Sequence, residues 1–152
     1  MNRNFPELKR FNYIITEMNA AYHRAAQRVG LSDSAMSILY SLCDNGGSRA
    51  LNDICRSSGL SKQTIGSSLH KLIADGYICL AESRGKLKTV ILTEKGTAFA
   101  EETVIPIMRI ENEIFGEWDR SELESYISLT QRFLDSFKEK TAKMPNKIKG
   151  EK

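Results

Sequence analysis

The sequence predicts a mainly α-helical fold with one small β-hairpin. Apolar residues recur at three- and four-residue steps over long segments near both ends of the chain, which is typical of amphipathic helices. Between these segments, two short helical patterns meet at a glycine-containing turn, Gly59-Leu60-Ser61. Residues 77–81 and 89–93 are rich in β-forming side chains and enclose a glycine turn, which indicates a hairpin directly after the second short helix.

The first two helices are predicted from their apolar spacing and their end signals. Pro6 and Glu7 suit a first helical turn, and Gly30 ends the first helix. Ser32 can cap a second helix, which Gly46 and Gly47 stop. The apolar side of the first helix is formed by Leu8, Phe11, Ile15, Met18, Tyr22, Ala25 and Val29.

The short segments that follow predict a helix-turn-helix. Residues 48–50 suit a short extended piece, and residues 51–58 suit a brief helix. Ser61 can cap the next helix through the free amides of Gln63 or Thr64, and Gly76 ends it. The exposed face of this helix is small, polar and nearly free of acidic residues, which suits close approach to bases and phosphates. An ordinary amphipathic surface helix has the same pattern, so the helix by itself leaves both interpretations open.

The hairpin carries a basic turn. Three basic residues, Arg84, Lys86 and Lys88, stand around Gly85 between the two β-forming segments. A hairpin directly after a helix-turn-helix is a wing, and its tip can lie along a phosphate backbone or in a minor groove. A solvent-exposed loop whose charges serve solubility is the alternative.

Two more long helices complete the chain. Thr93 can cap a helix over residues 94–115, in which Pro106 predicts a kink. Asp119 and Glu122 have capping-box spacing at the start of the last helix. We expect the first and last helices to pair across a two-fold axis, because a central module of this size cannot cover their apolar sides.

We therefore expect a single domain over residues 1–152. A DNA-binding lobe spans residues 31–93, and a helical dimerisation lobe combines residues 5–30 and 94–140. Residues 141–152 are expected to form a disordered basic tail.

The charge distribution points to a polyanionic partner. Residues 47–93 carry seven basic and three acidic side chains, a net charge of +4, whereas residues 94–139 carry five basic and eleven acidic side chains, a net charge of −6. Positive charge thus gathers on the helix-turn-helix and hairpin, as in nucleic-acid-binding proteins. A solvated basic surface without a ligand remains the alternative.

Several other classes of function are disfavoured. No apolar run approaches the roughly 18 residues of a membrane span, and the N-terminus lacks the apolar core of a signal peptide, so we expect a cytoplasmic protein without a membrane partner. The separated cysteines Cys43, Cys55 and Cys79 suit buried thiols rather than disulfides or a zinc site. His23 and His70 lack catalytic or ligand partners at a suitable spacing, so no enzyme activity, metal or cofactor is expected.

With these features, the sequence resembles the multiple-antibiotic-resistance regulator (MarR) family of bacterial winged-helix transcription factors. The resemblance runs from about Leu8 to Phe137, and is most specific in GLSKQTIGSSLHKLIADGYI, in the hairpin that follows and in VILTEKG. It implies an obligate homodimer that binds double-stranded DNA at a palindromic operator, as a repressor in many cases. A winged helix used as a protein-interaction module without specific DNA binding is the alternative, because one fold can serve several functions.

The resemblance also implies positions for the DNA contacts. The wing would use Arg84, Lys86 and Lys88. Two departures stand out: the family's Asp-x-Arg pair in the wing is replaced by Arg84 and Lys86, and Gly66 lies inside the helix. The residues that would face the major groove or its phosphates are Ser61, Lys62, Gln63, Thr64, Ser67, Ser68 and Lys71.

Many relatives respond to a small aromatic or phenolic effector in the cleft between the two lobes. Met18, Tyr22 and Met36 are candidates for lining that cleft, although a core position suits each of them better. Peroxide-sensing relatives carry a reactive cysteine near the start of the first helix. Because this chain has none there, our hypothesis is that thiol oxidation is not its switch.

Overall fold

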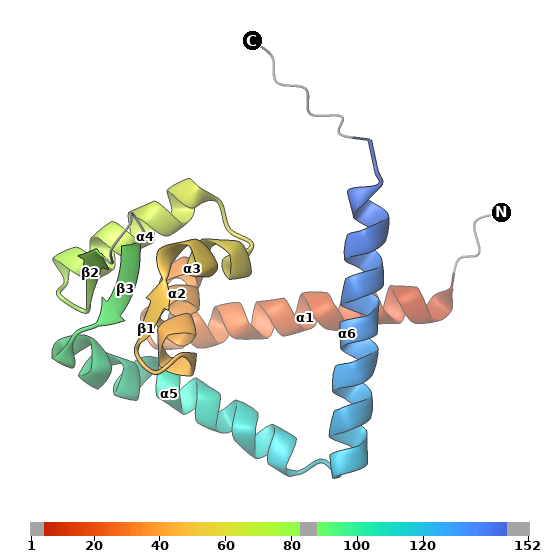
Figure 1. Cartoon of the computed structure of the whole chain (residues 1–152). Coiled ribbons are helices and arrows are strands. Elements are labelled where there is room, and N and C mark those ends of the chain that lie inside the picture. Colours follow the sequence, from red (N-terminus) through yellow and green to blue (C-terminus); the bar gives the residue numbers. More distant parts are fainter. Residues whose placement is uncertain (1–4, 83–87, 146–152) are drawn as a thin grey trace. The chain divides into compact units, whose positions relative to one another are not determined.

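The computed structural model describes residues 5–82 and 88–145, which form six helices and three strands (Figure 1). This arrangement confirms the predicted fold class, a winged helix-turn-helix with additional helices at both ends. The elements in chain order are α1 (Pro6–Arg28), α2 (Asp33–Asp44), β1 (Ser48–Ala50), α3 (Leu51–Ser58), α4 (Lys62–Ala74), β2 (Ile78–Glu82), β3 (Lys88–Leu92), α5 (Glu94–Gly116) and α6 (Arg120–Ala142).

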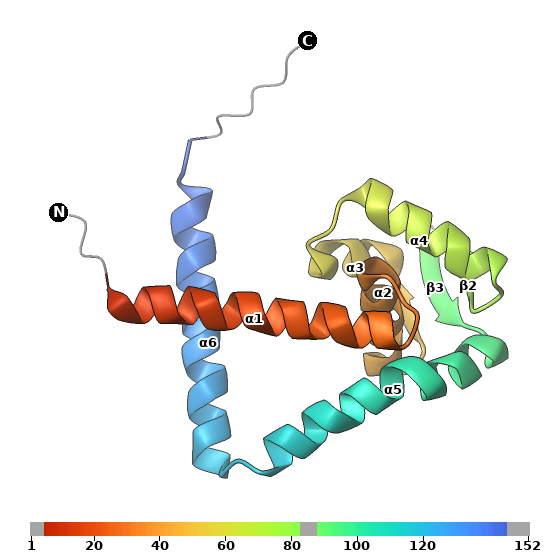
Figure 2. The ribbon, with the colours of Figure 1, turned by 180° about the vertical axis from the view of Figure 1, so that it is seen from behind.

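Helices α2, α5 and α6 begin at the capping residues that the sequence predicts. Ser32 Oγ accepts a hydrogen bond from Ala35 N at 3.2 Å, and α1 passes into α2 through the short turn that precedes this cap (Figure 2). Thr93 Oγ1 accepts from the backbone N–H of Gly96 at 2.9 Å at the start of α5. Asp119 N donates to Glu122 Oε2 at 2.9 Å at the start of α6. These bonds satisfy amide groups that a helix leaves unpaired in its first turn.

The three strands form one antiparallel sheet in the order β1-β3-β2. Ser48 pairs with Ile91, and Ile78 pairs with Leu92. The hairpin of β2 and β3 is the one predicted from the sequence. The pairing of β1 with β3 was not predicted, and it connects the hairpin to the segment before α3.

The hydrophobic core joins the sheet to α2, α3, α4 and the first half of α5. Ile38, Leu39 and Leu42 of α2 are completely buried at its centre. The other largely buried side chains of this cluster are Leu31, Ala35, Ile54, Ile65, Leu69, Leu72, Ile78, Val90 and Val104. The core therefore closes around the helix-turn-helix and fixes α4 against α2.

The chain divides into two compact units, Met1–Arg109 and Ile110–Lys152, with their boundary inside α5. Helix α5 continues through Pro106 without a stop. In the second unit, α6 has no buried residue. The predicted division into a DNA-binding lobe and a dimerisation lobe stays a prediction, as does the basic tail, of which residues 146–152 lie outside the described residues.

Across the described residues, no helix combines the length and the apolar character that crossing a membrane requires.

Candidate nucleic-acid interface

The turn between α3 and α4 is held by local hydrogen bonds. Gly59 adopts a left-handed conformation with φ of 66°, which glycine reaches without strain. Leu60 N donates to Ser58 Oγ at 3.2 Å. Ser61 Oγ then accepts from Thr64 N at 3.1 Å and lies 2.8 Å from Thr64 Oγ1. The predicted cap of α4 is thus confirmed, and it sets the direction in which α4 leaves the turn.

One side of α4 anchors the helix in the core. Ile65, Leu69 and Leu72 are 1%, 6% and 3% exposed, respectively, at the spacing of one helical face. Ser68, beside this face, is half-buried, and its hydroxyl lies 2.5 Å from the hydroxyl of the buried Ser34 in α2. The structure therefore places Ser68 at the contact between α2 and α4 and not with the exposed members of the predicted site.

The opposite side of α4 is exposed and polar. Gln63, Ser67 and His70 follow one another at steps of four and three residues, so they share one face. Ser67 Oγ donates to the Gln63 carbonyl at 3.0 Å. Lys62 and Lys71 are also exposed, and α4 contains no acidic residue. This face offers hydrogen-bonding groups between two positive charges, which suits a DNA groove with flanking phosphates.

His70 was not among the predicted contact residues, although the structure places it with Gln63 and Ser67. The periodicity of α4 already indicated this position, because residues 63, 67 and 70 lie on one side of a helix with 3.6 residues per turn. A neutral or protonated imidazole can donate a hydrogen bond to a base or a phosphate.

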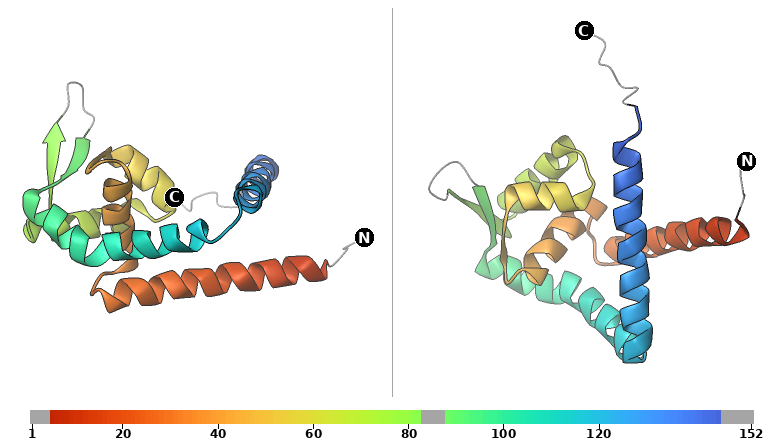
Figure 3. Two further views of the ribbon diagram at one scale, coloured as in Figure 1. Left: turned by 90° about the horizontal axis from the view of Figure 1, so that it is seen from below. Right: turned by 45° about the vertical axis from the view of Figure 1, so that its right-hand side comes forward.

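Strands β2 and β3 run side by side and extend away from the helices (Figure 3). Lys88 is exposed at the start of β3, where its backbone pairs with that of Glu82. The other two predicted wing contacts, Arg84 and Lys86, lie outside the described residues. The described part of the wing thus supplies one positive charge to the interface.

The C-terminal end of α4 is fastened to the start of α5 by hydrogen bonds. Lys95 Nζ donates to the Asp75 carbonyl at 2.7 Å, and Thr93 Oγ1 donates to the Gly76 carbonyl at 2.6 Å. The backbone N–H of Tyr77 returns to the Leu72 carbonyl at 2.9 Å, closing the last turn of α4. These bonds join the last turn of α4 to the start of α5.

Close packing reinforces the same junction. The rings of Tyr77 and Phe99 stack with their centroids 4.0 Å apart, and Lys95 Nζ lies 5.0 Å from the Tyr77 centroid. A Cβ atom on Gly96 would lie 1.8 Å from the Tyr77 carbonyl oxygen, so only glycine permits this approach. The orientation of α4 is therefore fixed at both ends, by the Ser61 cap and by this junction.

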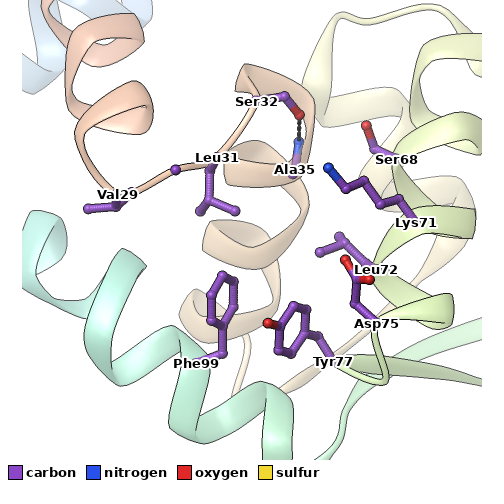
Figure 4. A pocket seen from close by; sticks show the side chains of 11 residues that line it. Val29, Leu31, Ser32, Ala35, Ser68, Lys71, Leu72, Asp75, Tyr77 and Phe99 are labelled. Atoms are coloured by element: carbon purple, nitrogen blue, oxygen red, sulfur yellow. Dashed lines mark hydrogen bonds between the residues drawn. The ribbon is translucent and has the colours of Figure 1, made fainter.

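The three residues predicted to line an effector cleft occupy different environments. Met18 and Tyr22 are 38% and 47% exposed on α1, whereas Met36 is half-buried against the core from α2. None of the three lines the pocket that lies between α2 and α4 (Figure 4). Their role in an effector site stays a prediction.

Among the described residues, no group of three or more histidine, cysteine, aspartate and glutamate side chains is arranged to hold a metal ion. His23 Nδ1 lies 2.9 Å from a carboxylate oxygen of Asp33, and both side chains are more than half exposed. This pair links α1 to α2 at the surface.

Residues 29–86, which contain the helix-turn-helix and most of the wing, match the model of the MarR family. This part of the chain is therefore similar to the MarR family. None of the curated proteins matches the sequence. The similarity to the family thus covers the lobe that carries the polar face of α4.

Solved structures extend the likeness in fold to most of the chain. NMB1585, a MarR family regulator from Neisseria meningitidis, has 18% sequence identity and a TM-score of 0.79, with 91% of this chain and 98% of that chain covered. MepR of S. aureus, in its DNA-binding conformation, has 18% identity and a TM-score of 0.72 over 88% and 99% of the two chains. NadR, in complex with 4-hydroxyphenylacetate, has 12% identity and a TM-score of 0.70 over 88% and 95%.

Proposed function

We propose that the protein is a homodimeric repressor that binds a palindromic operator, with α4 in the major groove and the wing on the flanking backbone or minor groove. The main support for this proposal is the exposed polar face of α4, which contains no acidic residue. Lys62 and Lys71 lie at the edges of this face, and both ends of the helix are held by hydrogen bonds. A helix held rigidly in this way can present the same side chains to every operator half-site.

The side chains on this face divide into two kinds of contact. Gln63 and His70 carry groups that hydrogen-bond to base edges, and a glutamine amide can pair with adenine through two bonds. Lys62, Lys71 and Lys88, together with Arg84 and Lys86, are suited to phosphates, which position a protein without reading sequence. Ser61 and Thr64 bond to each other, so we assign them mainly to capping and secondarily to phosphate contact.

The second copy in this proposal covers the apolar sides of α1 and α6. Leu8, Phe11 and Ile15 on α1 are between 36% and 46% exposed. On α6, Ile127, Phe133 and Phe137 are between 49% and 57% exposed, and the helix buries no residue. Apolar surface of this extent is unfavourable in water, and an identical chain supplies a matching surface through two-fold symmetry.

The proposal includes release of DNA by a small aromatic or phenolic effector in the cleft between lobes. Its support is the precedent of NadR, whose structure contains 4-hydroxyphenylacetate. Met18, Tyr22 and Met36 remain the candidate lining residues. Titration of 4-hydroxyphenylacetate into the protein–DNA complex tests this part, and an unchanged affinity for DNA would remove this compound from consideration.

The central test compares two substitutions on α4 with one on α6. Gln63→Ala should weaken binding to a selected operator by about ten-fold and leave random duplex unaffected, because one base contact contributes about 1–3 kcal/mol of discrimination. Lys62→Ala should weaken binding to both duplexes and lower the salt dependence by about one unit of slope. Arg132→Ala on α6 is the control, with no change expected.

Normal DNA binding by both α4 variants would contradict this interface. If a protein partner were lost at the same time, the protein-interaction interpretation would replace it. Sedimentation analysis of the wild-type chain tests the dimer separately, and a monomer at micromolar concentration would contradict that part.

A further inference from the structure

A pocket lies beside α4, next to the edge of the proposed DNA-binding face that Lys71 forms. It has a volume of about 270 Å³ and lies entirely within the first compact unit (Figure 4). Its walls come from the turn between α1 and α2, the second half of α4, and the junction with α5. The lining residues that matter here are Leu31, Ser32, Ser68, Lys71, Leu72, Asp75 and Phe99.

The inner part of this pocket is apolar. Leu31 and Leu72 are 9% and 3% exposed, so they belong to the core, and their small exposed parts line the pocket. Phe99, which stacks on Tyr77, supplies an aromatic ring beside them (Figure 4). An aliphatic or aromatic group of a ligand would lose contact with water here and gain packing contacts.

The outer part of the pocket carries two opposite charges on one helix. Lys71 and Asp75 are four residues apart, so they project from the same side of α4 in successive turns. Both are exposed, and neither forms an ion pair with another described residue. In Figure 4 the Lys71 ammonium group reaches toward the α2 side, and the Asp75 carboxylate lies on the α4 side of the pocket.

Hydroxyl groups stand between these charges and α2. Ser32 Oγ lies 3.3 Å from Ser34 Oγ, which in turn lies 2.5 Å from Ser68 Oγ. Each hydroxyl can donate and accept, so the row can adjust its hydrogen atoms to a ligand carboxylate. Lys71 and this row of hydroxyls therefore provide donors for an anionic group at one end of the pocket.

We propose that this pocket binds a small zwitterion of the apolar α-amino acid class. Its carboxylate pairs with Lys71 and accepts from Ser32 or Ser68, its ammonium group pairs with Asp75, and its side chain packs on Leu31, Leu72 and Phe99. A ligand with both charges satisfies both side chains, whereas a ligand with one charge leaves the other side chain with water alone.

Occupancy of the pocket has a consequence for DNA binding, and this consequence rests on the proposed function. Lys71 is among the residues assigned to DNA phosphates. Its ammonium group cannot pair fully with a ligand carboxylate in the pocket and with a DNA phosphate at the same time. The zwitterion should therefore weaken DNA binding, and DNA should weaken zwitterion binding by the same factor.

The experiment uses three probes of nearly equal size and shape on the full chain without DNA. L-leucine carries both charges, 4-methylpentanoate has the carboxylate alone, and 3-methylbutylamine has the ammonium group alone. Affinities are measured by NMR titration of backbone amides. Leucine should bind at least about ten-fold more tightly than either analogue, because one charge-assisted contact contributes this much.

Substitutions of Lys71 and Asp75 test which charged group of the ligand each side chain binds. Lys71→Met should reduce leucine affinity by about ten-fold to the level of the amine, and Asp75→Asn should reduce it to the level of the acid. Lys62→Met is the matched control, since Lys62 is an exposed lysine on the same helix outside the pocket. If 4-methylpentanoate binds as tightly as leucine or more tightly, the pocket is a simple anion site and the zwitterion proposal is wrong. If no probe binds, the pocket is not a binding site for this class of ligand.

The regulatory consequence has its own readout. Leucine should weaken DNA binding by the wild-type chain and not by Asp75→Asn, which keeps Lys71 but loses the ammonium contact. Leucine binding without any effect on DNA affinity would overturn the regulatory part alone. Absence of DNA binding under all conditions would instead count against the proposed function, because the probe titrations are carried out without DNA.

Discussion

The helices α2 and α6 both carry an apolar stripe, but they lie in very different environments. In α2, five of twelve residues are buried, and Ile38, Leu39 and Leu42 are completely buried. In α6, none of 23 residues is buried, although Ile127, Leu134 and Phe137 also belong to an apolar stripe. The comparison shows that an apolar stripe predicts that a helix face will be covered, but not which surface covers it.

The winged helix-turn-helix needs no second chain to complete its core, whereas α6 does in our proposal. The difference arises because the apolar side of α2 is covered by α3, α4 and the sheet of the same unit. Substitutions in the two regions should accordingly respond differently to protein concentration.

Gly96→Ala should destabilise the first unit by about 4 kcal/mol, because the new methyl group would overlap the Tyr77 carbonyl oxygen at 1.8 Å. Thermal or urea unfolding measures this change. Gly116→Ala is the control in the same helix, where nothing lies within 4 Å of an added Cβ atom, and stability there should be unchanged or slightly higher. Equal effects of both substitutions would contradict the close approach of α5 to Tyr77.

Ile38→Ala and Ile127→Ala test the comparison directly. Ile38 is 0% exposed, so its truncation should cost about 3 kcal/mol at any protein concentration. Ile127 is 55% exposed, so its truncation should leave the free energy of unfolding of a monomer within about 0.5 kcal/mol and should instead weaken self-association. Sedimentation and urea unfolding at several concentrations separate these effects. A concentration-independent loss at Ile127 similar to that at Ile38 would refute the distinction.

Gly66→Ala should stabilise α4 by about 1 kcal/mol, because alanine is the better helix former and the added Cβ atom has open space. If the backbone of α4 approaches DNA closely at Gly66, the same change should weaken DNA binding, since a methyl group would separate the two surfaces. Unfolding and DNA titration of one variant measure both effects. Higher stability with unchanged affinity would show that Gly66 does not serve close approach.

The cysteines should differ in reactivity at neutral pH. Burial raises the pKa of the Cys43 thiol, and the negative charge of Glu101 raises this pKa further. A higher pKa leaves less thiolate, so Cys43 should react slowly with a disulfide reagent, whereas the exposed Cys79 should react faster. Mass spectrometry after timed labelling measures both rates. Faster labelling of Cys43 than of Cys79 would contradict the burial of Cys43.

A separate test concerns our hypothesis that thiol oxidation is not the switch. Loss of DNA binding on mild peroxide treatment, abolished by one Cys→Ser change, would contradict this hypothesis.

Local signals in the sequence predicted the helix starts well. Ser32, Ser61 and Thr93 each accept the backbone hydrogen bond expected of a cap, because capping depends on residues only two or three positions apart. The exposed polar face of α4 was predictable for a similar reason, since helical periodicity separates it from Ile65 and Leu69.

Contacts between distant segments could not be predicted in this way. Ser68 was grouped with the polar face, but the structure turns it toward Ser34, which is 34 residues earlier in the chain. The pairing of β1 with β3 and the packing of Gly96 on Tyr77 likewise depend on how the core closes. The pocket beside α4 is lined by residues from the turn between α1 and α2, from α4 and from α5, so the sequence pattern contained no signal for it.

Sequence-specific DNA binding is tested by the affinity of the purified protein for DNA from upstream of its own gene. This affinity is compared with that for random duplex over a series of salt concentrations. We expect tighter binding to the upstream DNA and a steep decrease of the logarithm of affinity with the logarithm of salt concentration, because phosphate contacts release counterions. Equal, weak binding to both duplexes, or no binding at low salt, would contradict sequence-specific regulation through α4 and the wing.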